Sequence, residues 1–282
     1  MTTRLLTAAD ADALEAFLVE YRDSSMFLRA NSRLAGLEYH GEFLQGHYVA
    51  AFSGTDIVGV AGHFWNGMLI LQAPERVAEV ARAVLAASGR TVSGFIGPRE
   101  QVEGARDALA LMDAPTRIAH HDGLFALQLS ELAIPAALAN GELKCRAPIA
   151  EDRDTLSDWR LAYDIETLGG TDTPEARSAA AHWATSQISE GTGRVATQGG
   201  TLLSVSAFNA ALPDLVQLGG IFTPVERRGR GYARAAIAAS LIAARERGVT
   251  RAVLFASNPL AIRCYEALGF QRLGDFGLIL LA

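Results

Sequence analysis

The chain has 282 residues, half of them hydrophobic and a fifth charged, so its length favours two domains and its composition a well-buried core. The formal net charge of −6 argues against general binding to nucleic acids or to anionic membranes. Cys145 and Cys264 provide neither a disulfide framework nor a metal-ligand set. No apolar run is long enough to span a bilayer and the N-terminus lacks a signal-peptide pattern, so we expect a cytoplasmic protein.

The first half of the chain predicts a regular succession of strands and helices. A short strand at 4–6 leads into a helix that begins after Asp10, and an antiparallel meander with a turn at 53–56 follows. The remaining elements are expected as strands at 48–52, 57–62 and 68–71, a helix at 75–87, a strand at 92–96, a helix at 99–111 and a strand at 124–129. Residues 21–29 flank a loop, and we expect them to pack at an interface or, alternatively, to shape a substrate pocket.

The second half repeats the same order. Its expected elements are strands at 194–197, 202–208 and 216–222, a helix at 233–247, a strand at 252–255, a helix at 259–267 and a last strand at 276–280. A shift of 142 residues aligns Arg4 with Arg146 and Asp10 with Asp152. We interpret the chain as a tandem duplication, with domains at 1–140 and 143–282.

The turn that follows the strand at 216–222 is rich in arginine and glycine. Arg227, Arg228 and Arg230 crowd the start of the next helix, where the positive end of the helix dipole favours anions rather than cations. Gly229 and Gly231 remove side chains that would keep a ligand from the backbone N–H groups. This combination is typical of a phosphate-binding site, and a solvated basic turn is the alternative.

The corresponding turn of the first half differs. It reads Gln72-Ala73-Pro74-Glu75-Arg76, without glycine, and we expect Glu75 to be an ordinary acidic residue in the first turn of its helix. We therefore expect a phosphate site in the second half only.

A second informative stretch begins at Asn258. This residue is expected to cap a helix that starts at Pro259. Tyr265 lies two turns further, on roughly the same face, and its hydroxyl stays protonated at neutral pH. Tyr265 can therefore act as a proton donor; a core aromatic residue is the alternative.

The two stretches together resemble the GCN5-related N-acetyltransferase (GNAT) family. Arg228–Ala233 fits its Arg/Gln-x-x-Gly-x-Gly/Ala signature, and Asn258–Phe270 resembles its Asn-x-x-Ala-x-x-x-Tyr-x-x-x-Gly-Phe motif. The close match covers roughly 216–270, while the first half resembles the degenerate N-terminal copy of tandem members. The resemblance implies an α/β (α+β) fold of two GNAT-like domains, each a mixed, mostly antiparallel sheet flanked by helices, with only the second domain catalytic.

The resemblance also implies acetyl-CoA as acyl donor and an N-acetyltransferase that works by direct attack in a ternary complex. Tyr265 is the expected catalytic acid. The residues expected to bind CoA are Gly220, Ile221, Phe222 and Thr223 beside the pantetheine, Arg228, Gly229, Arg230, Gly231, Tyr232 and Ala233 at the pyrophosphate, and Asn258. A non-catalytic acyl-CoA sensor and a protein lysine acetyltransferase are the alternatives.

The sequence leaves the general base and the acceptor open. Gln217 is the one polar side chain on the strand where many relatives place a carboxylate, so Asp164 and Glu166 are the candidates, with Asp214 less favoured. Solvated carboxylates and a water chain are the alternatives. Cys264 is expected to be a structural thiol, and no metal site is expected. The acceptor is a small-molecule, peptide or protein amine; the acyl chain, and a monomer or a homodimer, stay open.

Overall fold

The computed structural model describes residues 2–282 and divides them into two compact units. Unit 1 takes the residues up to Leu124 together with Leu273–Ala282, and unit 2 takes Phe125–Arg272. Both units combine a mixed, mostly antiparallel sheet with flanking helices, so the predicted fold class is confirmed.

Unit 1 is a sheet of the order β1-β2-β3-β4-β5-β12 with two pairs of helices. Neighbouring strands are antiparallel except β4 and β5, which are parallel. Its elements are β1 (Thr2–Leu5), α1 (Ala11–Glu20), α2 (Met26–Ala35), β2 (Gly46–Ser53), β3 (Asp56–Phe64), β4 (Met68–Gln72), α3 (Val77–Ser88), β5 (Gly94–Pro98), α4 (Arg99–Ala108), the first part of β6 (Thr116–Gln128) and nearly all of β12 (Gln271–Leu281).

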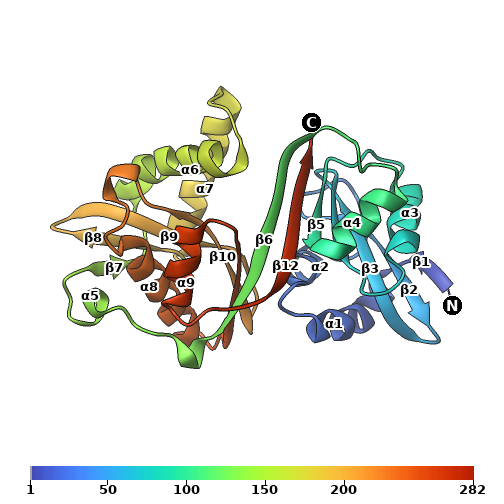
Figure 1. Ribbon diagram of the computed structural model, residues 1–282, viewed down its shortest axis with the longest axis horizontal. Helices are drawn as coiled ribbons and strands as arrows, with labels where there is room; N and C mark the ends of the chain where they lie inside the picture. The colour runs from blue at the N-terminus through green and yellow to red at the C-terminus, as the bar shows by residue number, and fades with distance from the viewer. Residues whose placement is uncertain (1) are drawn as a thin grey trace. The chain divides into compact units, whose positions relative to one another are not determined.

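Unit 2 is a sheet of the order β11-β10-β9-β8-β7, in which β10 and β11 are the parallel pair. Figure 1 shows β12 beside β5, a strand of unit 1. The elements of unit 2 are α5 (Ala136–Ala139), β7 (Lys144–Arg146), α6 (Arg153–Leu168), α7 (Pro174–Glu190), β8 (Arg194–Gln198), β9 (Thr201–Ala211), β10 (Leu215–Phe222), α8 (Tyr232–Glu246), β11 (Arg251–Ala256) and α9 (Pro259–Glu266).

Alternating side chains separate the core of each unit into two layers. In β2, Tyr48 and Ala50 pack against α1 and α2, while Val49 and Ala51 pack against α3 and α4. In unit 2, one cluster joins α6 and α7 to β8, β9 and β10, and another joins α8 and α9 to β9, β10 and β11. The helix pair α6–α7 and the pair α8–α9 thus cover opposite faces of the unit 2 sheet, with β10 between them.

The internal repeat is visible in single side chains. The guanidinium of Arg4 forms two hydrogen bonds to Asp10, at 2.6 and 2.9 Å, and that of Arg146 forms two to Asp152, at 2.5 and 2.9 Å. Each carboxylate also accepts a bond of 2.9 Å from the backbone N–H three residues before it. Each lies in a 3-10 turn that leads into the first helix of its unit. These matching contacts support the tandem duplication.

Several elements differ from the sequence-based expectations. Residues 26–35 form the helix α2, and Leu28 lies in the core of unit 1. The helix α7 and the first eight residues of β6 were not predicted at all. Glu75 precedes α3 and is not in its first turn, where Glu79 lies instead. The predicted boundary near residue 141 falls inside unit 2, and the last strand belongs to unit 1.

Candidate functional site

The strand β10 is interrupted by a bulge. Its register with β9 shifts between Gly219 and Phe222, and Gly220 adopts φ +61°, a conformation that glycine tolerates best. Within the described chain, the parallel pairing with β11 covers only Leu215–Gln217. The backbone from Gly220 onwards therefore departs from its neighbour on that side. The bulge thus lies at the Gly219-Gly220 pair.

The arginine–glycine turn forms an open entrance to α8. Gly229 and Gly231 have φ of +75° and +81°, so both adopt the left-handed conformation. Gly231 is the N-cap residue of α8, and no described side chain caps this helix. The first turn contains no acidic residue either. The N–H groups at the start of α8 and the positive end of its dipole therefore face outwards without a protein anion.

Arg228 is bound by oxygen atoms of its own unit. Its two Nη atoms donate to the carboxylate of Glu166 at 2.7 and 2.6 Å, and Nε donates to the Thr223 carbonyl at 2.9 Å. The hydrogen bond from Arg228 lowers the pKa of Glu166, and the same bond raises the pKa of Arg228. Arg227 donates to the carbonyl of Leu202, whereas Arg230 is exposed. The three arginines of the turn thus have three different surroundings.

The helix α9 carries the second motif as predicted. The side chain of Asn258 accepts bonds from the N–H groups of Leu260 and Ala261, at 2.8 and 3.3 Å, and Pro259 occupies the first helical position. Tyr265 is 9% exposed, and its ring lies 6.0 Å from that of Phe270. The predicted cap is confirmed. Burial of Tyr265 at the edge of a core is compatible with a structural role as well as a catalytic one.

One hydrophobic cluster connects the two motifs. Tyr265 belongs to the same cluster as Leu218 of β10, and Ile221 and Ala233 pack against that cluster. The bulged strand, the start of α8 and α9 therefore meet, although their residues lie up to 47 positions apart in the sequence. The roles of these residues in binding and catalysis remain predictions.

Arginines bind two of the three candidate bases, Asp164 and Glu166. Asp164 accepts from Nε of Arg160 at 3.0 Å, and Glu166 is bound by Arg228. Asp214 precedes β10 by one residue, and about six residues of extended chain, roughly 20 Å, separate it from Gly220. A carboxylate held by a guanidinium accepts a proton poorly, because the pair stabilises its charged form. The structure therefore favours none of the three as a general base.

Sequence reasoning missed a group of residues beside the bulge. A Cβ atom on Gly220 would lie 3.1 Å from the indole of Trp183 and 3.6 Å from Nη1 of Arg160. The guanidinium of Arg160 also lies 5.4 Å from the ring centre of Tyr163. The four-residue spacing of Arg160 and Asp164, which is that of neighbours on one helix face, was the available signal. Trp183 comes from α7, which was not predicted.

The equivalent turn of unit 1 is closed. The N–H of Ala73 donates to the side chain of Gln101 on α4, at 2.6 Å. A Cβ on Gly59 would lie 2.3 Å from the carbonyl oxygen of Glu75, so the turn lies tightly against β3. Arg76, with φ +60°, occupies the N-cap position of α3. Side chains and backbone thus fill the place where unit 2 has an open glycine turn.

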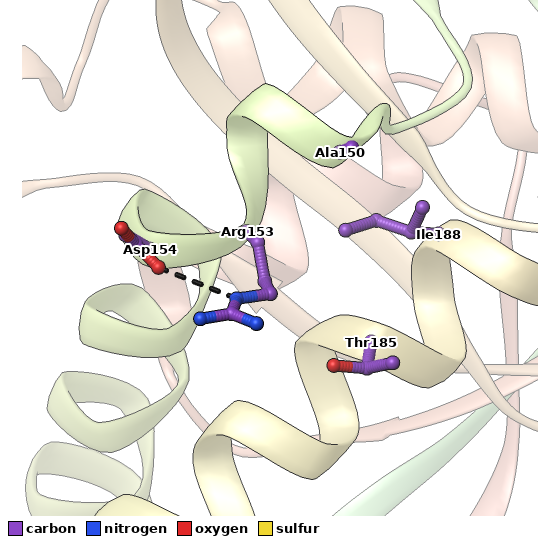
Figure 2. A pocket seen from close by; sticks show the side chains of 5 residues that line it. All are labelled: Ala150, Arg153, Asp154, Thr185 and Ile188. Carbon is purple, nitrogen blue, oxygen red and sulfur yellow. Dashed lines mark hydrogen bonds and ion pairs between the residues drawn. The ribbon is translucent and has the colours of Figure 1, made fainter.

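Other features of unit 2 add no chemistry to this site. Figure 2 shows a shallow hollow lined by Ala150, Arg153, Asp154, Thr185 and Ile188, none of which belongs to either motif. Burial raises the pKa of Cys264, as expected for a structural thiol. Among residues 2–282, no group of three or more histidine, cysteine or acidic side chains is arranged to hold a metal ion.

Comparison with known proteins identifies the family. Residues 159–270 match the family described as "Acetyltransferase (GNAT) family". This match lies within unit 2. The match includes the bulged strand, the arginine–glycine turn and the Asn258–Phe270 motif, so the resemblance inferred from the two motifs is confirmed.

Solved structures share the fold of both units. A Drosophila protein superposes with a TM-score of 0.67 at 12% identity, over 99% of this chain and 98% of that one. A GCN5-related N-acetyltransferase from Sphaerobacter thermophilus gives 0.59 at 13% identity, over 99% and 94%. A tandem GNAT protein from the clavulanic acid biosynthesis pathway gives 0.51 at 14% identity, over 100% and 98%. At these identities the likeness concerns the fold alone.

Two negative findings complete the description, one on sequence relatives and one on membrane-spanning helices. No curated protein matches the chain in sequence. In the described part of the chain, no helix has the length and hydropathy needed to cross a membrane.

Proposed function

We propose that the protein is an N-acetyltransferase that transfers the acetyl group of acetyl-CoA to an amine by direct attack in a ternary complex, at one site in unit 2. The observation that carries this proposal is the meeting of the two family motifs in one cluster, where Tyr265 lies with Leu218 and beside Ile221 and Ala233. The family match of residues 159–270 supports acyl transfer in general, and the surroundings of these residues support the assignment of roles.

The turn Arg228–Ala233 is suited to the pyrophosphate of CoA. The uncapped start of α8 supplies N–H groups and a positive dipole end, and the two glycines let an anion approach them. Arg228 and Arg230 add positive charge beside it. The pantetheine follows the backbone of Gly220–Thr223, which is not paired with β11. Asn258, the N-cap residue of α9, lies on the other side of the pantetheine.

Transfer then needs two proton movements. The amine nitrogen attacks the thioester carbon, the carbon–sulfur bond breaks, and the hydroxyl of Tyr265 donates its proton to the departing thiolate. The proton of the attacking amine passes to water, because arginines already bind the carboxylates of Asp164 and Glu166. The products are the N-acetylated amine and free CoA, and solvent returns a proton to Tyr265.

The test measures thiol release from acetyl-CoA in the presence of an amine panel. Replacing Tyr265 by Phe should lower turnover by roughly 100-fold or more, the usual contribution of a positioned acid, with the affinity for acetyl-CoA unchanged. Tyr39→Phe in unit 1 is the matched control and should leave turnover unaffected. Unchanged turnover in Tyr265→Phe would remove this residue from the mechanism.

The same assay separates the alternatives. Tight binding of acetyl-CoA by the unmodified protein without transfer to any amine would indicate an acyl-CoA sensor. Transfer to lysine-containing peptides but not to small amines would indicate a protein lysine acetyltransferase.

A further inference from the structure

A guanidinium group lies against the bulge of β10. Nη1 of Arg160 is 3.6 Å from the position that a Cβ of Gly220 would occupy, and Cζ2 of Trp183 is 3.1 Å from it. Because Gly220 has no side chain, Arg160 and Trp183 are the groups that the bulge faces on the side of α6 and α7. The proposed function brings the acyl carbon to this bulge, so these side chains lie on the acceptor side of the reaction.

Three neighbours fix the orientation of Arg160. Its guanidinium lies 5.3 Å from the ring centre of Trp183 and 5.4 Å from that of Tyr163. Asp164, one helical turn later, accepts from Nε at 3.0 Å and pairs with Nη2 at 3.0 Å. The side chains of Arg160 and Asp164 are only 21% and 26% exposed. The guanidinium is therefore partly desolvated and held in place before any substrate binds.

One edge of the guanidinium has no partner. Arginine carries five N–H groups, and Asp164 engages one edge, formed by Nε and Nη2. Within residues 2–282, no acceptor contacts Nη1. Of the Arg160 atoms, Nη1 lies nearest to the Cβ position of Gly220. The edge formed by Nη1 and the second N–H of Nη2 matches the two oxygens of a carboxylate. Asp164 already neutralises the charge of Arg160. A second carboxylate would therefore be recognised by its two hydrogen bonds to the free edge of the guanidinium.

We propose that Arg160 binds the carboxylate of the acceptor, and that the acceptors are therefore amines that carry a carboxylate, of the amino acid class. This inference rests on the proposed N-acetyltransferase function. A carboxylate on the free edge of Arg160 places an amino group one or two carbons away beside Gly220, where the acyl carbon is presented. An amine without an anionic group gains nothing from this edge. Trp183, Tyr163 and Asp164 act as positioning residues for Arg160.

The test compares three matched amines with acetyl-CoA: an α-amino acid, its carboxamide and its decarboxylated amine. The amino acid should have a kcat/KM at least roughly 10-fold higher than the other two, as expected for hydrogen bonds to a charged group. Arg160→Gln should bring this ratio close to one, by raising KM for the amino acid while the carboxamide is unaffected. Arg160→Lys keeps the charge but lacks the fork, so an intermediate ratio is expected.

Arg153→Gln is the matched control. Arg153 lies on the same helix, its side chain is 59% exposed, and it pairs with the neighbouring Asp154 (Figure 2). This variant should keep the full ratio. Equal turnover of the three amines, or a ratio that Arg160→Gln leaves unchanged, would overturn the inference while leaving the N-acetyltransferase function intact. Preference for a phosphorylated amine over the amino acid would also overturn it.

Failure of the proposed function would look different, since no amine would then release thiol. The inference would in that case be decided by calorimetry, with the same three amines added to the CoA-loaded protein. Binding of the amino acid that is lost in Arg160→Gln and kept in Arg153→Gln supports the carboxylate site. Absence of binding overturns it.

Discussion

Arg228 already has partners at the place where we propose that it binds the pyrophosphate of CoA. In the protein alone, its guanidinium binds both carboxylate oxygens of Glu166 and the carbonyl of Thr223. The side chains of Arg228 and Glu166 are 40% and 49% exposed, so their ion pair stabilises the fold by at most about 1 kcal/mol. A pyrophosphate carries more charge and more oxygen acceptors than one carboxylate. It can therefore replace Glu166 on Arg228 at little cost.

We predict that Glu166→Gln binds acetyl-CoA up to about fivefold more tightly, because Arg228 no longer has to leave a charged partner. The pKa of Glu166 lies below its ordinary value, so this carboxylate is already ionised across the neutral range. The pH dependence of kcat/KM between pH 6 and 9 should therefore be the same in the variant. Calorimetry and a pH–rate profile measure the two quantities.

Weaker binding in Glu166→Gln would mean that the pair holds Arg228 in its binding position rather than competing with the ligand. Loss of the pH dependence would identify Glu166 as the general base after all. Glu226, exposed and next to Arg227, provides a control substitution of the same chemistry.

At the level of elements, the repeated Arg–Asp fork joins the first strand of each unit to its first helix. The two copies differ in burial: the side chain of Asp152 is 5% exposed and that of Asp10 is 14%. Their partners Arg146 and Arg4 are 37% and 48% exposed. Burial by itself would raise the pKa of Asp152, but the bonds from Arg146 and from the N–H of Ile149 outweigh it, and the net shift is downwards.

We predict that Asp152→Asn lowers the free energy of unfolding by about 2 kcal/mol at pH 7, through loss of charge-assisted hydrogen bonds. Asp10→Asn, the matched substitution in unit 1, should cost about 1 kcal/mol because its pair is more exposed. Urea unfolding measures both. A larger effect of Asp10→Asn would contradict the argument from burial.

The same fork sets an acid limit on stability. The folded pKa of Asp152 is depressed, so its contribution is complete above the unfolded value of about 3.9 and is lost as the pH falls below it. The difference between the protein and Asp152→Asn should therefore shrink between pH 5 and pH 2.

The strands and the motif helices were predictable because their signals are local. The apolar runs of β2 and β3, the Gly229–Gly231 turn and the Asn258–Pro259 helix start each lie within a few residues. The helix α7 escaped prediction because its buried face is made of Ala180, Ala184 and Gln187, which have little hydrophobic contrast with their neighbours. The helix α2 buries Arg29 and Asn31, and this breaks the apolar pattern.

The residues of the candidate site differ in the same way: local sequence predicts some of them and not others. Tyr265, Asn258 and the glycines could be named from motifs that fit short stretches. The ion pair between Arg228 and Glu166 joins residues 62 positions apart, and the contact of Trp183 with the bulge joins residues of α7 and β10. Such contacts depend on tertiary packing, which no local pattern encodes.

At the scale of the whole molecule, the last strand of the chain completes the first unit. The strand β12 pairs with β5 over five residues, from Phe276 opposite Pro98 to Leu280 opposite Gly94. Phe276 and Ile279 are 2% and 1% exposed, and Ile279 lies in the core cluster of α3 and α4. The C-terminal ten residues therefore belong to unit 1 energetically, although the duplication in sequence assigns them to the second half.

We predict that removing residues 273–282 destabilises unit 1 while unit 2 keeps its affinity for acetyl-CoA. Hydrogen exchange should become fast for the β5 amides that bond to β12, while exchange in β10 should stay slow. Ile279→Ala is a milder variant, expected to cost about 2–4 kcal/mol through a core cavity. If the truncated protein lost acetyl-CoA binding while the β5 amides stayed protected from exchange, the last ten residues would belong to unit 2 instead.

The pairing of β5 with β12 has a consequence for synthesis on the ribosome. Domains usually fold in the order in which they emerge, the N-terminal one first. Here Pro98 can pair only after Phe276 has been synthesised, and Phe276 lies 178 residues further along the chain. At ordinary elongation rates that interval is roughly 10–35 s, and β5 has an open edge throughout it. The nascent first unit is thus the part of this protein most in need of protection by chaperones, and the second unit can be complete before it.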